Sequence, residues 1–169
     1  MMKKKYNSDI LDQDSLEGRP VNYPFPKENN QLFFIQRNHN TNTVVYTVNY
    51  QSDGMVNLNE PMSIYWIKYN DSSKIELLNL IQNALAYGYK SEVINGDLIQ
   101  FKFVCHKRSF YLAKIDGTFK VFTVFDGVNY VVKNIYVHAE EFGAFPVVNF
   151  VEIYGLCPEG KDVVKRIEF

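Results

Sequence analysis

Cysteine is nearly absent from the sequence, which contains only Cys105 and Cys157 among 169 residues. Two thiols are too few for the disulfide framework of a small secreted domain, and their separation fits no zinc-binding pattern. A chain of this length does not need disulfide bonds or a structural metal to fold, because a domain of this size buries roughly 70% of its extended surface when it folds. We therefore expect two free thiols, no metal site and no cofactor.

The sequence also lacks an excess of either charge: 18 Lys and Arg residues oppose 19 Asp and Glu residues, giving a net charge of -1. Nucleic acid is therefore not expected as a partner, because there is no global positive field to attract phosphates. No apolar run approaches the roughly 20 residues of a membrane-spanning helix, so we expect no transmembrane segment.

No signal peptide is expected in the sequence as given. Residues 1–5 are basic, but residues 6–17 are polar and acidic where an apolar run would be required. As given, the sequence predicts a cytoplasmic protein. An exported protein would show the same pattern after processing, so this alternative stays open.

The glycine motifs of common enzyme classes are missing too. Neither the Gly-x-Gly-x-x-Gly spacing of dinucleotide-binding proteins nor the Gly-x-Ser-x-Gly spacing of a nucleophile elbow occurs, and there is no phosphate-binding loop. The sequence therefore leans towards a non-enzymatic protein.

Aromatic residues, in contrast, are abundant, with 12 Tyr, 13 Phe and one Trp. They favour β-strands, because flat side chains pack well on a pleated surface. Runs rich in Phe, Val, Ile and Tyr are separated by dipeptides typical of two-residue hairpin turns, which predict a meander of about five strands over residues 89–138. These dipeptides are Asn95-Gly96, Asp116-Gly117 and Asp126-Gly127.

Further strand-like runs bring the expected total to about ten. They cover residues 32–37, 43–50, 62–69, 145–154 and 162–168. One helix is expected, because Ser73 to Glu76 form a capping-box pattern and apolar residues then recur at helical spacing up to residue 85. Gly88 is placed to end this helix in a left-handed cap.

These elements predict an all-β, mainly antiparallel fold with one α-helix. Residues 1–30 are expected to form a flexible N-terminal tail or loose wrap, and residues 31–169 a single β-rich domain. The consecutive hairpins favour a meander barrel of the lipocalin or calycin kind. The alternative is a two-sheet β-sandwich, for which the loop over residues 51–61 would supply the crossing connection.

Few residues suggest chemistry. The three histidines, His39, His106 and His138, are expected to lie apart, because strands of a meander alternate in direction. Cys105 and His106 should point to opposite faces of a strand, which leaves Cys105 as a small core residue.

Carboxylates are the other candidates. Glu140 and Glu141 are expected in a solvated loop. Glu152 lies in an apolar strand, where an edge position facing solvent is favoured. Pointing inward, it would need a cationic partner, and the candidates are Arg37, Lys102 and Arg108.

Several segments, taken together in their order, resemble an uncharacterised family called domain of unknown function 4833. The resemblance covers about residues 31–168, and Asn38 departs from the small residue that often follows the arginine of the first segment. It implies no activity and no catalytic residues, but it implies a bacterial protein of a family in which many members look exported. The segments are residues 34–40, 44–46, 61–67, 86–89, 135–137 and 151–155.

The leading hypothesis is a non-enzymatic β-barrel that binds a small, partly apolar or anionic ligand, with Arg37, Trp66 and Arg108 as binding residues. Arg37 and Arg108 are expected at one end of the barrel together with Lys68, where three cations would suit an anionic headgroup. One alternative is a hydrolase using Glu152 or His39, and another is an assembly domain using an edge strand over residues 162–168. The sequence does not predict an oligomeric state.

Overall fold

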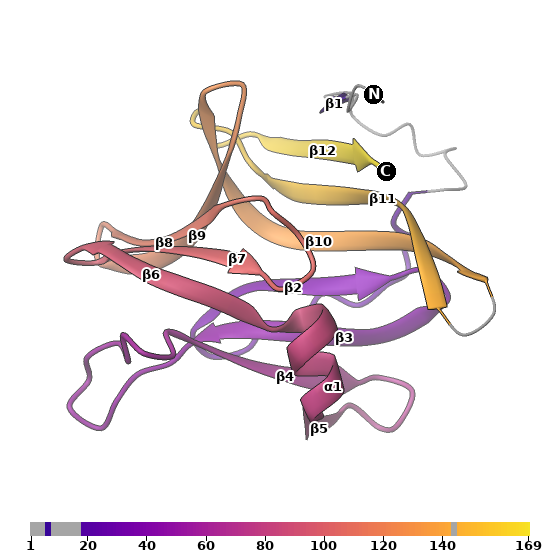
Figure 1. The fold of residues 1–169 in the computed structure, drawn as a ribbon, viewed down its shortest axis with the longest axis horizontal. Helices are drawn as coiled ribbons and strands as arrows, with labels where there is room; N and C mark the ends of the chain where they lie inside the picture. Colours follow the sequence, from indigo (N-terminus) through magenta and orange to yellow (C-terminus); the bar gives the residue numbers. More distant parts are fainter. Residues whose placement is uncertain (1–5, 8–17, 143–144) are drawn as a thin grey trace.

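The computed structural model describes residues 6–7, 18–142 and 145–169, and its strands form one curled mixed sheet with the shape of a half-barrel (Figure 1). The all-β fold class with one short helix is therefore confirmed. Along the main path the strands are β5 (Lys74–Leu77), β4 (Met62–Lys68), β3 (Asn40–Val48), β2 (Gln31–Arg37), β10 (Val128–Phe142), β9 (Thr118–Phe125), β8 (Phe110–Ile115), β7 (Leu98–Phe103) and β6 (Tyr89–Asn95).

Strand β10 joins the parts of the sheet. Its opposite edge carries β11 (Phe145–Leu156), which pairs with β12 (Asp162–Glu168), and β12 pairs with the two-residue strand β1 (Tyr6–Asn7). Val131 of β10 pairs with β9 on one side and β11 on the other, and Asn134 pairs with β2 and β11. Strands β9 and β2 therefore lie on the same edge of β10, one after the other. The sheet forks there into two leaves, β2 to β5 and β6 to β9.

The expected meander is confirmed: β6 to β10 are consecutive antiparallel neighbours joined by short turns. Asp116 and Gly117 have φ angles of 51° and 80°, and Asp126 and Gly127 have angles of 52° and 77°. Two successive positive φ angles are the geometry of a type I′ turn, whose twist matches that of the flanking strands.

The two leaves face each other across one aromatic core. Phe33 of β2 stacks on Tyr46 of β3 with ring centroids 4.3 Å apart, and it meets Phe101 and Phe103 of β7 at 6.3 and 6.0 Å. All four rings are buried. Because side chains alternate along a strand, the neighbours of Phe33 and Ile35 on β2, Phe34 and Gln36, point to the convex side instead.

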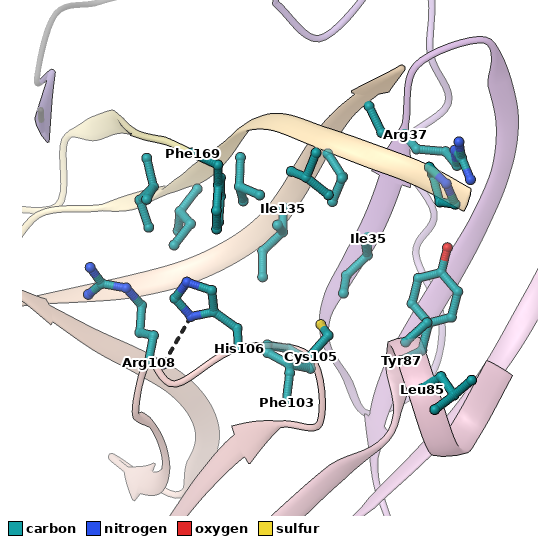
Figure 2. A pocket seen from close by; sticks show the side chains of 18 of the residues that line it. Ile35, Arg37, Leu85, Tyr87, Phe103, Cys105, His106, Arg108, Ile135 and Phe169 are labelled. Carbon is teal, nitrogen blue, oxygen red and sulfur yellow. Dashed lines mark hydrogen bonds between the residues drawn. The ribbon is translucent and has the colours of Figure 1, made fainter. Parts of the chain in front are cut away.

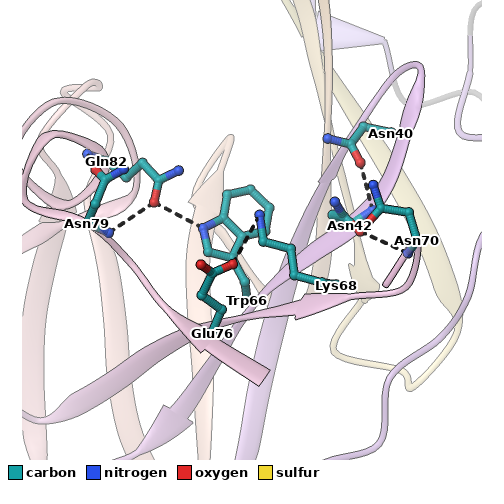
Figure 3. Close-up of polar contacts among 8 residues, drawn as sticks. All are labelled: Asn40, Asn42, Trp66, Lys68, Asn70, Glu76, Asn79 and Gln82. Atoms are coloured by element: carbon teal, nitrogen blue, oxygen red, sulfur yellow. Dashed lines mark hydrogen bonds and ion pairs between the residues drawn. The ribbon is translucent and has the colours of Figure 1, made fainter. Parts of the chain in front are cut away.

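The helix begins later than the sequence predicts. Ser72 and Ser73 have positive φ angles of 53° and 59°, which an N-cap does not adopt, and the residues that follow pair with β4 as strand β5. The observed helix is α1 (Leu80–Gln82), continued by the π-helical turn η1 (Asn83–Tyr87). Its capping box is formed by Asn79 and Gln82 (Figure 3).

Gly88 does not form a left-handed cap, because its φ and ψ angles of -67° and 165° are extended. Glycine is required here because the backbone at Gly88 lies close to that of Asn83, and a Cβ at this position would collide with the Asn83 carbonyl oxygen. The loop over residues 51–61 joins the adjacent strands β3 and β4 and is therefore not a crossing connection. The segment that crosses is α1 with η1, which leads from β5 at one end of the sheet to β6 at the other.

Residues 18–30 lie along the convex side of the sheet rather than forming a free tail. The Nε of Arg19 donates to Oε1 of the buried Gln36 at 2.9 Å, and Nε2 of Gln36 donates to the carbonyl of Pro24 at 2.8 Å. Tyr23 is buried against Tyr136 and Phe150. This part of the predicted tail is a strap, whereas residues 1–5 and 8–17 lie outside the described residues.

Candidate functional site

A cavity of about 400 Å³ opens on the concave side, between β2, the β10–β11 pair and the end of the helical segment (Figure 2). Most of its wall is aliphatic or aromatic, so its interior suits an apolar group. It is lined by Ile35, Arg37, Leu85, Ala86, Tyr87, Phe103, Cys105, His106, Arg108, Phe110, Ile135, Val137, Ala139, Pro146, Val148, Val151, Ile153, Ile167 and Phe169.

Arg37 stands at one end of this cavity, at the end of β2. Its side chain is 30% exposed, and its Nη2 lies 3.8 Å from Oε1 of Glu141, whose side chain is 80% exposed. The hydroxyl of Tyr87 points towards Arg37 (Figure 2). Burial raises the pKa of Tyr87, although the charge of Arg37 lowers it, so Tyr87 stays a neutral hydrogen-bond donor at physiological pH.

Arg108 and His106 form another part of the wall, in the connection between β7 and β8. The backbone N–H of Arg108 donates to Nδ1 of His106 at 2.9 Å, which leaves the ring proton of a neutral imidazole on Nε2. The guanidinium of Arg108 lies 4.0 Å from the centre of the Phe125 ring, and Nη1 donates to the carbonyl of Val124 at 2.9 Å. Arg108 is thus held in place by packing as well as by hydrogen bonding.

Cys105 lines the cavity but is not the core residue that the sequence predicts. Strand β7 ends at Phe103, so the alternation that would bury Cys105 stops before it, and the residue is exposed. Partial desolvation raises the pKa of its thiol, which disfavours a reactive thiolate at neutral pH.

Trp66 is not part of the cavity wall, although the sequence groups it with Arg37 and Arg108. Its ring meets Tyr87 edge to face at 5.3 Å, and its Nε1 donates to Oε1 of Gln82 at 3.2 Å (Figure 3). Trp66 therefore supports the wall residue Tyr87 and attaches the helical segment to β4. Lys68 also lies outside the wall: its Nζ sits 4.3 Å above the Trp66 ring and 3.8 Å from Glu76.

Glu152 is wholly buried, so the favoured edge position facing solvent is wrong. It lies on the convex side of β11, under the strap, and none of the three expected cations is its partner. The partner is Arg166 of β12, with 3.7 Å between Nη2 and Oε2, and the Tyr154 hydroxyl donates to Oε2 at 3.3 Å. Strand parity gives the reason, because Val151 and Ile153 occupy the concave side.

A second, more polar cavity of about 530 Å³ adjoins Arg37. The strand pair β2 and β10 brings two of the three histidines to it, because their parallel register sets Arg37 beside Val137. Glu140 and Glu141 belong to β10 rather than to the expected loop, and both are exposed. This cavity is lined by Arg37, Asn38, His39, Asn40, His138, Ala139, Glu140 and Glu141.

The residues of the hydrolase hypothesis lie apart. His39 lines the second cavity, Cys105 lines the first, and Glu152 is buried on the convex side. No group of three or more His, Cys, Asp or Glu side chains in residues 18–141 and 146–169 is arranged to hold a metal ion. The strand proposed for assembly, β12, pairs with β11 along its length and with β1 at Arg166 and Ile167, whereas β5 and β6 end the main path of the sheet.

One family model, described as "Domain of unknown function (DUF4833)", matches residues 33–166. The chain belongs to the DUF4833 family. The predicted resemblance is thereby confirmed, and the matched region contains all of the cavity wall except Ile167 and Phe169. No curated protein and no solved structure matches this DUF4833 chain. No helix in the described part of the chain is long and apolar enough to cross a membrane.

The sequence does not predict Leu85 and Ala86 as wall residues, whereas Tyr87 belongs to an aromatic run, residues 87–89, for which a pocket wall and core packing are the two interpretations. The helical spacing predicts Leu85 on the buried side of a longer helix, whereas it is 71% exposed at the rim of the cavity.

Proposed function

We propose that this DUF4833 domain binds a small molecule with an apolar body and an anionic group. The observation that carries the proposal is the cavity of about 400 Å³, which is largely apolar and has Arg37 at one end. Its volume lies in the range of small-molecule sites, about 300–1,000 Å³. In this proposal Arg37 and Arg108 bind the ligand, as the sequence predicts, and Trp66 contributes indirectly by supporting Tyr87.

The surroundings of the rim support an apolar ligand. Leu80, Ile81 and Leu85 are 88%, 70% and 71% exposed on the helical segment, and Leu85 itself lines the cavity. Large apolar residues grouped on a surface are typical of interaction sites, because exposing them to water is unfavourable. Leu85 belongs both to this exposed group and to the cavity wall, so the exposed apolar surface reaches the rim of the cavity.

Decanoate tests the proposal, because it combines a flexible apolar chain with one carboxylate. We expect calorimetry to show saturable binding to the wild-type chain, and Arg37→Met to weaken it about tenfold, the effect of losing roughly 1.4 kcal/mol from one charge-assisted interaction. Lys90→Met is the matched control, since Lys90 is exposed on β6 and outside the cavity.

Filling the cavity is the second arm of the test. Ala86→Trp places a large ring in the wall and should abolish decanoate binding, whereas Ala84→Trp, in the same helical turn but outside the wall, should not. Thermal unfolding of both variants verifies that they fold. Equal binding by a folded Ala86→Trp variant would exclude this cavity as the site.

A further inference from the structure

The two cavities share part of their walls. Arg37 and Ala139 line both of them, one largely apolar and the other polar. A single ligand could therefore place its apolar body in the first cavity and a polar headgroup in the second, passing Arg37 on the way. The ligand class proposed above does not require the polar cavity. Its side chains therefore indicate a further property of the ligand, the chemistry of its headgroup.

The shared wall is held in a fixed position by Asn38. Its Nδ2 donates to the carbonyl of Ala139 at 2.9 Å, and its Oδ1 accepts from the backbone N–H of Ala139 at 3.0 Å. The backbone N–H of Asn38 also donates to the carbonyl of Val137 at 3.2 Å. Asn38 is buried, so these hydrogen bonds lie away from competing water. The turn after β2 is thereby fastened to β10 and the polar cavity keeps its shape.

Residues that carry charges of both signs line the polar cavity. Arg37 contributes a cation, Glu140 and Glu141 contribute carboxylates, and His39 and His138 add imidazoles. His138 is held in orientation, because its ring stacks on Phe150 at 4.7 Å and its Nδ1 lies 3.3 Å from Oδ1 of Asn149. A purely anionic headgroup would meet repulsion from the carboxylates, whereas a headgroup of both signs would find a partner for each charge.

The Arg37–Glu141 pair leaves room for such a ligand. At 3.8 Å its separation exceeds the 2.7–2.9 Å typical of a charge-assisted hydrogen bond, and Glu141 is 80% exposed. An exposed ion pair of this kind contributes little to stability, because water screens it. A phosphate can therefore displace the carboxylate from Arg37 at little cost, and the released carboxylate is then free to face a ligand cation.

We propose that the polar cavity binds a zwitterionic headgroup made of a phosphate and an ammonium group, carried by a single-chain amphiphile whose tail fills the apolar cavity. Arg37 contacts the phosphate, Glu141 contacts the ammonium group once it is displaced from Arg37, and Glu140, the neighbouring carboxylate on β10, adds negative charge nearby. This inference rests on the proposed function, because the tail occupies the cavity assigned there, and it adds the class of headgroup.

Three ten-carbon amphiphiles test the proposal by calorimetry on the full chain, each below its micelle-forming concentration: decylphosphocholine, decyl phosphate and decanoate. We expect decylphosphocholine to bind most tightly. The double variant Glu140→Gln/Glu141→Gln should weaken the binding of decylphosphocholine by about three- to fivefold, consistent with losing up to roughly 1 kcal/mol of exposed ion pairing. The same variant should bind decyl phosphate more tightly than the wild type does. Glu92→Gln, an exposed carboxylate on β6, is the control and should change neither.

The outcomes separate this inference from the proposed function. If decyl phosphate binds as tightly as decylphosphocholine, and the double variant leaves that order unchanged, the headgroup assignment is wrong while the apolar site stands. If none of the three amphiphiles binds, or if all bind equally to the folded Ala86→Trp variant, the proposed function fails and this inference fails with it. A loss of decylphosphocholine preference in the double variant, with thermal stability unchanged, supports the assignment.

Discussion

Glu152 and Arg166 face each other across β11 and β12, and Oε2 and Nη2 of their side chains lie 3.7 Å apart. The carboxylate is wholly buried, and the Arg166 side chain is 15% exposed with its guanidinium 4.0 Å from the centre of the Phe150 ring. Ions removed from water lose hydration that only close partners can replace. In the observed register of the last two strands, the pair lies on the convex side, under the strap.

Removing one member of this pair should be costly. We expect Arg166→Met to lower the free energy of unfolding by about 3 kcal/mol, because it leaves a buried carboxylate without its cation. Lys161→Met is the control, since Lys161 is exposed near the start of β12. Urea unfolding measures both variants at pH 7. A loss as small in Arg166→Met as in Lys161→Met would contradict this view of the pair.

The stability of the protein should also depend on pH through the ionisation of Glu152. Burial raises the pKa of its carboxyl, although Arg166 and Tyr154 act in the opposite direction. The folded state therefore holds this proton more tightly than the unfolded state, whose carboxyl has its ordinary pKa of 4.5. The stabilisation of the folded state by this proton is fully present below pH 4.5 and is lost as the pH rises through the raised pKa of Glu152 in the folded state.

We therefore expect the stability of the wild type, relative to Glu152→Gln, to fall as the pH rises from 4 towards neutrality. Urea unfolding at several pH values measures this difference. Glu168→Gln, which changes an exposed carboxylate on the same strand as Arg166, is the control variant. A difference that rises with pH would mean that the folded pKa is lowered.

Gly155 is required by a close approach between strands. It pairs with Val132 of β10, and a Cβ at this position would collide with the carbonyl oxygen of Val131. Backbone atoms cannot move aside as a flexible side chain can, so we expect Gly155→Ala to destabilise the fold by about 3 kcal/mol. Gly160→Ala is the comparison, because Gly160 has a φ of 79° but open space around it and should cost about 1 kcal/mol. Thermal unfolding should rank the two variants in this order.

Arg19 should hold the strap on the sheet. Besides its bond to Gln36, its Nη2 donates to the carbonyl of Pro24 at 3.0 Å, and its guanidinium lies 4.0 Å from the centre of the Phe25 ring. Arg19→Met should lower stability by about 1–2 kcal/mol and speed amide hydrogen exchange over residues 18–26. Lys27→Met, an exposed change in the same strap, should leave exchange at these residues unaltered. Unchanged exchange in the Arg19 variant would show that the other contacts of the strap, the Gln36–Pro24 hydrogen bond and the packing of Tyr23, are enough to hold it.

Trp66 offers an optical test of ligand binding, because it is the only tryptophan in the chain and contacts the wall residue Tyr87. We expect decanoate to shift its fluorescence emission with the same saturation curve as the calorimetric binding. Trp66→Phe should weaken binding only about two- to fivefold, because it removes the hydrogen bond to Gln82 but keeps an aromatic ring beside Tyr87. A larger loss, equal to that of Arg37→Met, would indicate direct contact of Trp66 with the ligand.

The hairpins were predictable because their cause is local. Asp116-Gly117 and Asp126-Gly127 adopt positive φ angles that few other residues tolerate, and such a turn sets the register of its two strands. The helix was not, because the capping pattern at Ser73 competes with pairing to β4. The four residues 74–77 form four backbone pairs with that strand, and only α1, beginning at Leu80, continues as helix.

The candidate site was only partly predictable. Arg37 and Arg108 are candidate cations in the sequence, but their common cavity depends on the fork of the sheet at β10, which brings together strands distant in the chain. The burial of Glu152 depends on the strap and on Arg166, and neither contact leaves a short-range pattern.

The amino-acid sequence by itself determined the β-rich class, the meander and its turns, since alternation and turn chemistry act within a few residues. Tertiary structure alone decided the parallel pairing of β2 with β10, the late start of the helix and the two cavities that meet at Arg37. The reason is physical: such features arise from contacts between distant segments, whose free energy outweighs local preference.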